Sequence, residues 1–114
     1  MIKEITATEF KTKYLNNLDT LELIDVREES EFNQIKIKGS KLIPINQLGQ
    51  SLNEIDWSKE VIFICRTGAR SEYVTSALKE MGYEGINLAG GINILRMNCE
   101  ECIEKGDLNR DYFY

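Results

Sequence analysis

Short apolar runs alternate along the chain with amphipathic or turn-rich segments. The apolar runs have the length of β-strands and lie at residues 2–5, 21–25, 41–43, 61–64 and 86–88. The segments between them carry helical periodicity or turn-forming residues. Strands that alternate with helices through short connections are typical of a parallel sheet with helices on both faces. We therefore predict one α/β domain with a sheet of about five parallel strands.

Helices are expected in the segments between these strands. Thr6 and Glu9 form a candidate capping box, and the helix that follows should end near residues 16–17. Further helices are predicted over residues 29–34 and over the amphipathic stretch 45–55. We expect these helices to cover the sheet, which is a structural role.

The strand at residues 61–64 leads directly into the most informative part of the chain. Its continuous apolar character is typical of a strand that is buried on both faces. Cys65 follows at once, then a short polar loop with Gly68 near its centre, then an amphipathic helix that should end at Gly82. The sequence therefore places a thiol at the carboxyl end of a central strand, in front of a helix N-terminus.

Several groups near Cys65 favour a thiolate. Successive backbone N–H groups of a tight loop can converge on an anion, and the helix start adds a partial positive charge. Arg66 and Arg70 add two cations. Each of these should lower the pKa of Cys65 and make it more nucleophilic at neutral pH. The chain has no histidine, so a Cys–His dyad is impossible, and activation must come from backbone dipoles and arginine.

The loop from Cys65 to Arg70 has the form Cys-x4-Arg. Loops of cysteine-dependent phosphatases have the form Cys-x5-Arg, which can encircle a phosphate with its oxygens. A ring that is one residue shorter suits a smaller group, such as one sulfur atom attached to the cysteine. The loop length therefore argues against a phosphatase or an arsenate reductase, which we keep as the less favoured alternatives.

Three blocks of the sequence together resemble the rhodanese-like family of single-domain sulfurtransferases. These blocks are residues 65–71, residues 23–28 followed by Glu31 and Phe32, and residues 88–92. They stand in the order and spacing of the family, and the resemblance covers about residues 1–97. It implies the rhodanese-like α/β fold. Because the strand ends of a parallel sheet with short connections lie on one side, the glycine pair at residues 90–91 should border the loop at Cys65.

The resemblance implies a sulfurtransferase in which Cys65 is the catalytic residue. Cys65 would take the outer sulfur of an anionic donor such as thiosulfate, hold it as a persulfide and pass it to a thiophilic acceptor. The residues expected to bind the donor and the persulfide are Arg66, Thr67, Gly68, Ala69 and Arg70. Arg66 should point outward, whereas Arg70 would either contact the donor or tie the loop down.

The expected partners are a small anionic sulfur donor and a thiol or protein that accepts the sulfur. No cofactor and no metal ion is implied. The other hypothesis is a non-catalytic binding module or a partner-specific persulfide relay, which also needs Cys65. The sequence does not identify the physiological donor, the acceptor or the oligomeric state.

The chain also departs from the family pattern. The family has a glycine, a histidine and a proline in the stretch where this chain has Ile35, Lys36 and Lys38, so any role for that histidine is impossible here. Upstream, the resemblance implies that Asp25 and Arg27 support the active-site loop through polar contacts. The alternative for both is a solvated turn at the strand end.

Cys99 and Cys102 form a Cys-x-x-Cys pair with three interpretations: half of a zinc site, a redox pair that resolves a persulfide on Cys65, or two residues that face the core. The chain has neither a second such pair nor a histidine to complete a zinc site. A last helix is expected to begin at Ile92, and its apolar face would continue through both cysteines to Ile103. The helical phase favours the packing interpretation.

Composition sets limits on these hypotheses. A chain of 114 residues suits a single domain, with a core over about residues 1–104 and a tail at 105–114 whose aromatic end would pack on the domain or on a second subunit. The net charge of −5 argues against nucleic acid and acidic membranes as partners.

We find no signal peptide and no run of transmembrane length, and three cysteines in such a chain suggest free thiols in a reducing compartment. We therefore expect a cytoplasmic protein.

Overall fold

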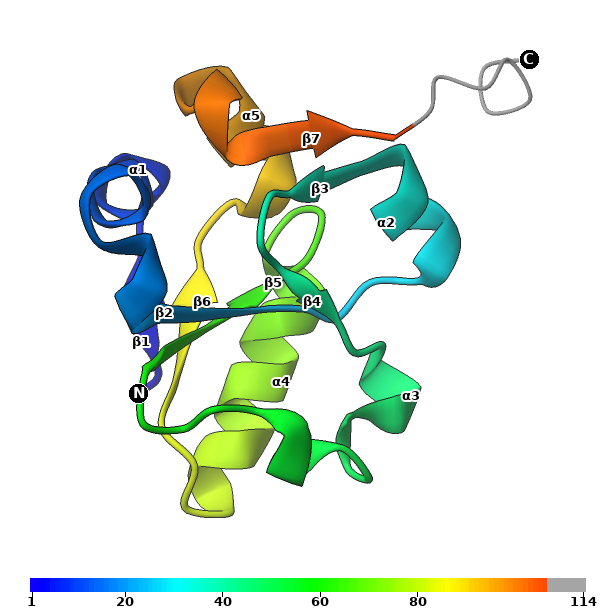
Figure 1. Cartoon of the computed structure of the whole chain (residues 1–114). Helices are drawn as coiled ribbons and strands as arrows, with labels where there is room; N and C mark the ends of the chain where they lie inside the picture. The colour runs from blue at the N-terminus through cyan, green and yellow to red at the C-terminus, as the bar shows by residue number, and fades with distance from the viewer. Residues whose placement is uncertain (107–114) are drawn as a thin grey trace.

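A five-stranded sheet with the order β1-β6-β5-β2-β4 forms the centre of the molecule in the computed structural model, which describes residues 1–106 (Figure 1). The strands are β1 (Lys3–Ile5), β2 (Leu21–Asp25), β4 (Lys41–Leu42), β5 (Glu60–Ile64) and β6 (Gly85–Leu88). All neighbours in this sheet pair in parallel, so their carboxyl ends lie along one edge. The predicted sheet is confirmed.

Helices cover both faces of the sheet, as the alternating pattern predicts. They are α1 (Ala7–Asn17), α2 (Glu29–Gln34), α3 (Ile45–Leu48), α4 (Ala69–Glu80) and α5 (Gly91–Asn98), with short 3₁₀ turns η1 (Leu18–Thr20), η2 (Leu52–Glu54) and η3 (Glu100–Cys102). One core cluster joins α1 and α5 to the sheet, and a second joins α3 and α4 to the opposite face (Figure 1). Alternate residues of β5 enter the two clusters, because successive side chains of a strand point to opposite faces.

The first helix begins at the predicted capping box. The Thr6 N–H donates to Glu9 Oε1 at 2.9 Å, and the Glu9 N–H donates to Thr6 Oγ1 at 3.1 Å. These two bonds satisfy N–H groups that have no partner within the helix. The helix ends at Asn17, within the predicted range.

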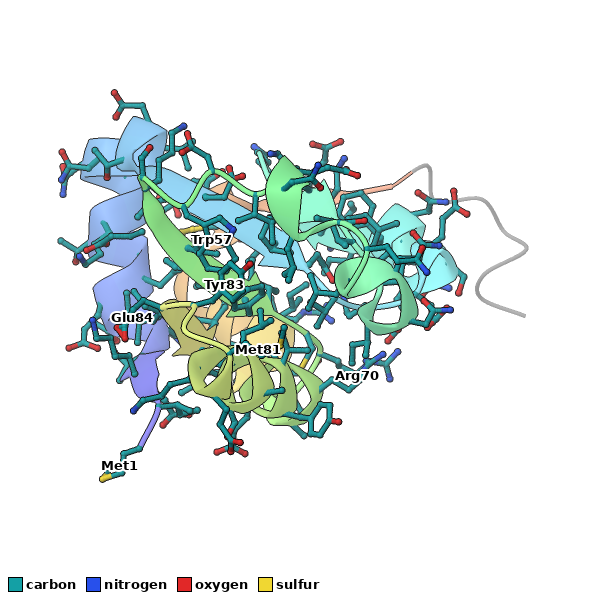
Figure 2. The ribbon with its side chains drawn as sticks, turned by 90° about the horizontal axis from the view of Figure 1, so that it is seen from below. Met1, Trp57, Arg70, Met81, Tyr83 and Glu84 are labelled. Atoms are coloured by element: carbon teal, nitrogen blue, oxygen red, sulfur yellow. A yellow bond between two sulfur atoms is a disulfide. The ribbon has the colours of Figure 1, made fainter. Side chains whose placement is uncertain are left out.

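The helix predicted over residues 45–55 is wrong beyond its first turn. Helix α3 ends at Leu48, and the chain continues through tight turns in which Ser51 N–H donates to the Leu48 carbonyl. Gly49 explains the early end, since glycine is a poor helix former. The apolar residues of the stretch still pack on the sheet, and Leu52 also accepts a hydrogen bond from Trp57 Nε1 at 3.0 Å. In Figure 2 Trp57 lies beside Tyr83 in this layer.

A small second sheet was not predicted. Strand β3 (Ile35–Ile37) pairs antiparallel with β7 (Ile103–Lys105), so the last described strand closes over the segment that departs from the family pattern (Figure 1). The helix predicted to run from Ile92 to Ile103 therefore ends early, at Asn98. The apolar spacing beyond that point belongs to a turn and a strand, and those side chains are buried in the same core cluster or packed against it.

Cys99 and Cys102 are joined by a disulfide and are both fully buried. The packing interpretation is right about their burial, but the expectation of free thiols is wrong for this pair. A zinc site at the pair is contradicted because each sulfur is already bonded to the other. Neither sulfur is a free thiol while this bond exists, so neither can attack a persulfide on Cys65 in this state, and the resolving role stays a prediction.

The structure also bears on membrane spans and metal ligands. Within residues 1–106, no helix is long and apolar enough to cross a membrane, and no three His, Cys, Asp or Glu side chains gather as metal ligands. The predicted packing of the aromatic end falls on residues 112–114, which lie outside the described part of the chain.

Candidate active site

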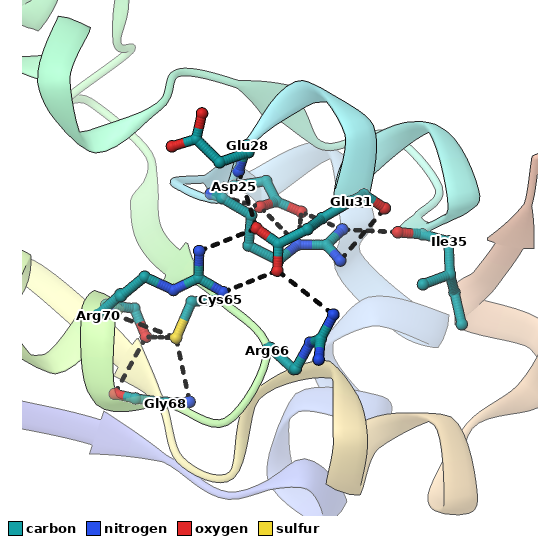
Figure 3. A network of polar contacts seen from close by, with 10 residues as sticks. Asp25, Glu28, Glu31, Ile35, Cys65, Arg66, Gly68 and Arg70 are labelled. Atoms are coloured by element: carbon teal, nitrogen blue, oxygen red, sulfur yellow. Dashed lines mark hydrogen bonds and ion pairs between the residues drawn. The ribbon is translucent and has the colours of Figure 1, made fainter. Parts of the chain in front are cut away.

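Cys65 lies at the carboxyl edge of the sheet, directly after β5, and is 1% exposed. Three donors surround its sulfur. Sγ accepts hydrogen bonds from the Gly68 N–H at 3.1 Å, the Ser71 N–H at 3.4 Å and the Ser71 hydroxyl at 3.3 Å. Figure 3 shows the loop curling back over the sulfur. The N–H groups of Gly68, which precedes α4, and of Ser71, in its first turn, thus converge on the sulfur, whereas the sequence placed the donors in residues 66–70.

Gly68 allows the loop between Cys65 and α4 to turn tightly. Its φ is 99°, in the left-handed region that favours glycine. A Cβ at this position would lie 3.0 Å from the backbone nitrogen of Gly90. The Gly68 carbonyl also accepts the Glu72 N–H at 2.9 Å, which starts the helix. A larger residue here would push the loop away from its neighbour and from Cys65.

The glycine pair at residues 90–91 borders the loop, as the sequence predicts. A Cβ on Gly91 would lie 2.5 Å from the carbonyl oxygens of both Cys65 and Arg66. Those two oxygens accept the N–H groups of Ile92 and Asn93, each at 3.0 Å. The N-terminus of α5 therefore holds the back of the loop by hydrogen bonds that only a close approach of the two backbones permits.

The pKa of Cys65 lies below its ordinary value. Burial alone would raise the pKa, but hydrogen bonds from the Ser71 hydroxyl and from the backbone N–H groups of Ser71, Gly68 and Thr67 outweigh that effect. The sequence predicted the lowered pKa and the backbone contribution. It also predicted a contribution from arginine, and a charge interaction with Cys65 is among the causes that raise the pKa of Arg70.

Both arginines of the loop face Glu31, which lies in α2. Arg70 Nη1 and Nη2 donate to the two carboxylate oxygens at 2.9 Å each, and Arg66 Nη2 lies 3.6 Å from Glu31 Oε2 (Figure 3). The hydrogen bonding to Arg70 is the largest cause that lowers the pKa of Glu31, which falls to about 2. The Glu28 N–H and the charges of Arg70 and Arg27 add to it. Arg66 is the more exposed arginine, with 58% of its side chain accessible. Arg70 ties the loop to α2, which is one of the two roles considered for it.

Asp25 and Arg27 form a buried ion pair beneath this cluster. Their side chains are 0% and 2% exposed, and Arg27 Nη2 lies 2.8 Å from Asp25 Oδ2. Arg27 Nη2 also donates to the Ile35 carbonyl at 2.6 Å. The pair therefore joins the end of β2 to the start of β3, as expected of structural supports rather than solvated charges.

Thr67 and Ala69 are the remaining predicted binding residues. Their side chains are exposed. The Thr67 N–H is among the groups that lower the Cys65 pKa.

Three functional side chains were missed from the sequence. Ser71 stands in the recognised loop, but the role of its hydroxyl was not predicted. Asn87 is a buried polar residue in β6, and its Oδ1 lies 2.5 Å from the Ser71 hydroxyl oxygen. A polar residue inside an apolar strand is a signal that could have identified it. Glu31 was recognised only as part of a motif.

Comparison with known proteins finds similar sequences and structures. A model of the rhodanese-like domain matches residues 6–96. A putative sulfurtransferase of Bacillus subtilis, YtwF, is 36% identical over 91 residues, which cover 80% of this chain and 87% of that protein. A putative sulfur carrier protein of the same organism, YrkF, is 33% identical over 80% of this chain and 49% of its own length. The crystal structure of a rhodanese-like domain protein from Staphylococcus aureus superposes with a TM-score of 0.76 at 30% identity, covering 82% of this chain and 91% of that one.

Proposed function

Because this chain belongs to the rhodanese-like domain family, we propose that it is a sulfurtransferase that carries sulfur as a persulfide on Cys65. Relatives named as sulfurtransferases support sulfur transfer in general. The observation that carries the proposal is the ring of donors from Gly68 and Ser71 around Cys65 Sγ. These donors favour the thiolate, which is the form that attacks sulfur.

In the first half-reaction, the Cys65 thiolate attacks the outer sulfur of thiosulfate and forms a new S–S bond. The S–S bond of thiosulfate breaks, and sulfite leaves with the bonding electron pair. A thiolate and a dianion thus become a persulfide anion and a dianion, so that charge and atoms balance. The backbone N–H groups of residues 66–70 would bind the charge on the outer sulfur, as an oxyanion hole does.

In the second half-reaction, a thiophilic acceptor such as cyanide or a thiolate attacks the outer sulfur of the persulfide. The Cys65 thiolate leaves and is ready for another cycle. A covalent intermediate between two half-reactions predicts ping-pong kinetics.

The two arginines take different roles in this proposal. Arg66 is exposed and only loosely paired, so it is the residue that would attract an anionic donor. Arg70 is held by two hydrogen bonds to Glu31 and would keep the loop in shape. Thr67 and Ala69 would serve through their N–H groups.

The alternative is a partner-specific persulfide relay, which loads sulfur on Cys65 but does not turn over with small acceptors. The 33% identity to a putative sulfur carrier protein favours it. Both functions need the same thiolate and differ only in the acceptor.

Steady-state formation of thiocyanate from thiosulfate and cyanide tests the proposal. We expect ping-pong kinetics from the wild type and no turnover from Cys65→Ser. Loading of sulfur from thiosulfate without turnover on cyanide or small thiols would favour the relay. An absence of loading together with hydrolysis of an aryl phosphate would contradict both.

A further inference from the structure

Glu31 places a negative charge among the groups that should attract the sulfur donor. It comes from α2, whereas the arginines it contacts belong to the loop that follows β5 (Figure 3). Its carboxylate accepts two hydrogen bonds from Arg70 and lies 3.6 Å from Arg66. Its side chain is 17% exposed, so solvent screens this charge only in part.

The hydrogen bonds of Glu31 limit what Arg70 can offer a ligand. Arg70 donates to Glu31 through both terminal nitrogens at 2.9 Å, the bidentate arrangement in which guanidinium groups bind oxyanions. A donor anion would have to displace the carboxylate to use the same fork. Arg66 is held less tightly, so only its exposed guanidinium can turn toward a ligand at small cost.

The charges around Cys65 cancel when the thiolate is present. Arg66 and Arg70 contribute two positive charges, and Glu31 and the Cys65 thiolate contribute two negative ones. The buried pair of Asp25 and Arg27 adds no net charge. A pKa of about 2 keeps Glu31 ionised at any pH used for assay. A donor therefore meets side chains whose formal charges sum to zero, so only the N–H groups of the loop and of the helix start favour a second negative charge.

We propose that Glu31 determines donor specificity by disfavouring dianionic donors such as thiosulfate and favouring sulfane donors that carry a single negative charge. Thiosulfonates and the persulfides of small thiols belong to this class. The inference rests on the proposed sulfurtransferase function and names the substrate class of the same site.

The chemistry with a monoanionic donor is the same as with thiosulfate. The Cys65 thiolate attacks the outer sulfur of a thiosulfonate, the S–S bond of the donor breaks, and a sulfinate leaves with the electron pair. One thiolate and one monoanion give one persulfide anion and one monoanion. Thiosulfate and benzenethiosulfonate thus form a pair of probes that deliver the same sulfur and differ in net charge by one.

The test compares kcat/KM for thiosulfate and for benzenethiosulfonate, with cyanide as acceptor, in the wild type and in Glu31→Gln. Removing one negative charge near the reacting sulfur should raise the ratio of thiosulfate to thiosulfonate by about three- to tenfold. The ratio should fall back toward the wild-type value as salt is added, because salt screens charge. Glu29→Gln is the matched control, since it removes the same charge from an exposed position of the same helix and should leave the ratio unchanged.

A second variant separates charge from position. Glu31→Asp shortens the side chain but keeps its charge, and we expect it to keep the wild-type ratio. An equal fall in kcat/KM for both donors in Glu31→Gln would overturn the proposal and leave Glu31 as a support for Arg70. An unchanged ratio in Glu31→Gln would overturn it as well. Failure of both donors to load sulfur on the wild type would instead contradict the sulfurtransferase function itself.

Discussion

The Ser71 hydroxyl lies 2.5 Å from Asn87 Oδ1 and can donate its single proton either to this oxygen or to Cys65 Sγ. The Asn87 amide donates in turn to Glu4 Oε2 at 2.9 Å, which turns its Oδ1 toward Ser71. The same hydroxyl lies 3.3 Å from Cys65 Sγ. A buried amide from β6 thus fixes a hydroxyl beside the sulfur, and this link connects the rigid sheet to the reactive group.

We expect Ser71→Ala to make Cys65 less reactive, because the hydroxyl is one of the groups that lower its pKa. The rate of alkylation by iodoacetamide at neutral pH should fall by about two- to fivefold, as suits the loss of one hydrogen bond among several. Cys65 is the free cysteine of the described chain, so the label reports on it directly. Ser76→Ala changes an exposed serine of the same helix and is the control. An equal rate in Ser71→Ala and the wild type would show that the hydroxyl does not act on the thiolate.

Arg27→Met should destabilise the fold strongly. It leaves Asp25 charged and buried without its partner, which costs about 3–5 kcal/mol of unfolding free energy. Lys13→Met breaks a pair of the same 2.8 Å length to Glu60 at the surface and should cost less than about 1 kcal/mol. Urea unfolding measures both. Similar losses in the two variants would mean that the buried pair is not a support of the loop.

Gly91→Ala should damage the active-site loop through a steric clash. Its Cβ would meet the carbonyl oxygens of Cys65 and Arg66 at 2.5 Å, and we expect a loss of about 3 kcal/mol or more in stability and slower loading of sulfur. Gly39→Ala is a sharp control because Gly39 also has a positive φ, of 87°, but has open space around it. Its cost should be about 1 kcal/mol, from backbone strain alone. Thermal unfolding compares them, and equal costs would rule out the clash.

The stability of the protein should decrease in acid partly through Glu31. Its pKa is lowered from 4.5 to about 2 in the folded state, so the carboxylate contributes stability above pH 4.5 that is lost as the pH falls toward 2. This loss should amount to roughly 2–3 kcal/mol. The difference in unfolding free energy between the wild type and Glu31→Gln should therefore shrink between pH 5 and pH 2. A difference that stays constant over this range would contradict the strong pairing of Glu31 with Arg70.

The sequence was sufficient to predict the central sheet and the position of Cys65, because both depend on local patterns. The apolar run at residues 61–64 and the loop after it carry that information within a short stretch. The helix predicted through Ile103 failed for the opposite reason. A spacing that buries one face of a helix can also be met by a turn and a strand, and only the pairing of β7 with the distant β3 decides between them.

The candidate site was likewise predicted only in part. The backbone donors follow from the loop and were predicted, whereas the partner of Arg70 was not. Glu31 lies in another helix, far away in the sequence, and several acidic residues near it are equally plausible partners from spacing alone. The pairing of Glu31 with the loop arginines therefore could not be predicted from the residue types of the loop motif alone.

The most direct test of the account is to find the atom that receives the sulfur. The protein is incubated with thiosulfate or, in a parallel sample, with benzenethiosulfonate and is then freed of excess donor. Its intact mass and peptide masses are recorded without reduction. We predict a gain of one sulfur atom, located on the peptide that contains Cys65 and absent from Cys65→Ser. A protein that gains no sulfur from either donor, or a Cys65→Ser variant that gains it equally well, would contradict the assignment of Cys65 as the sulfur carrier.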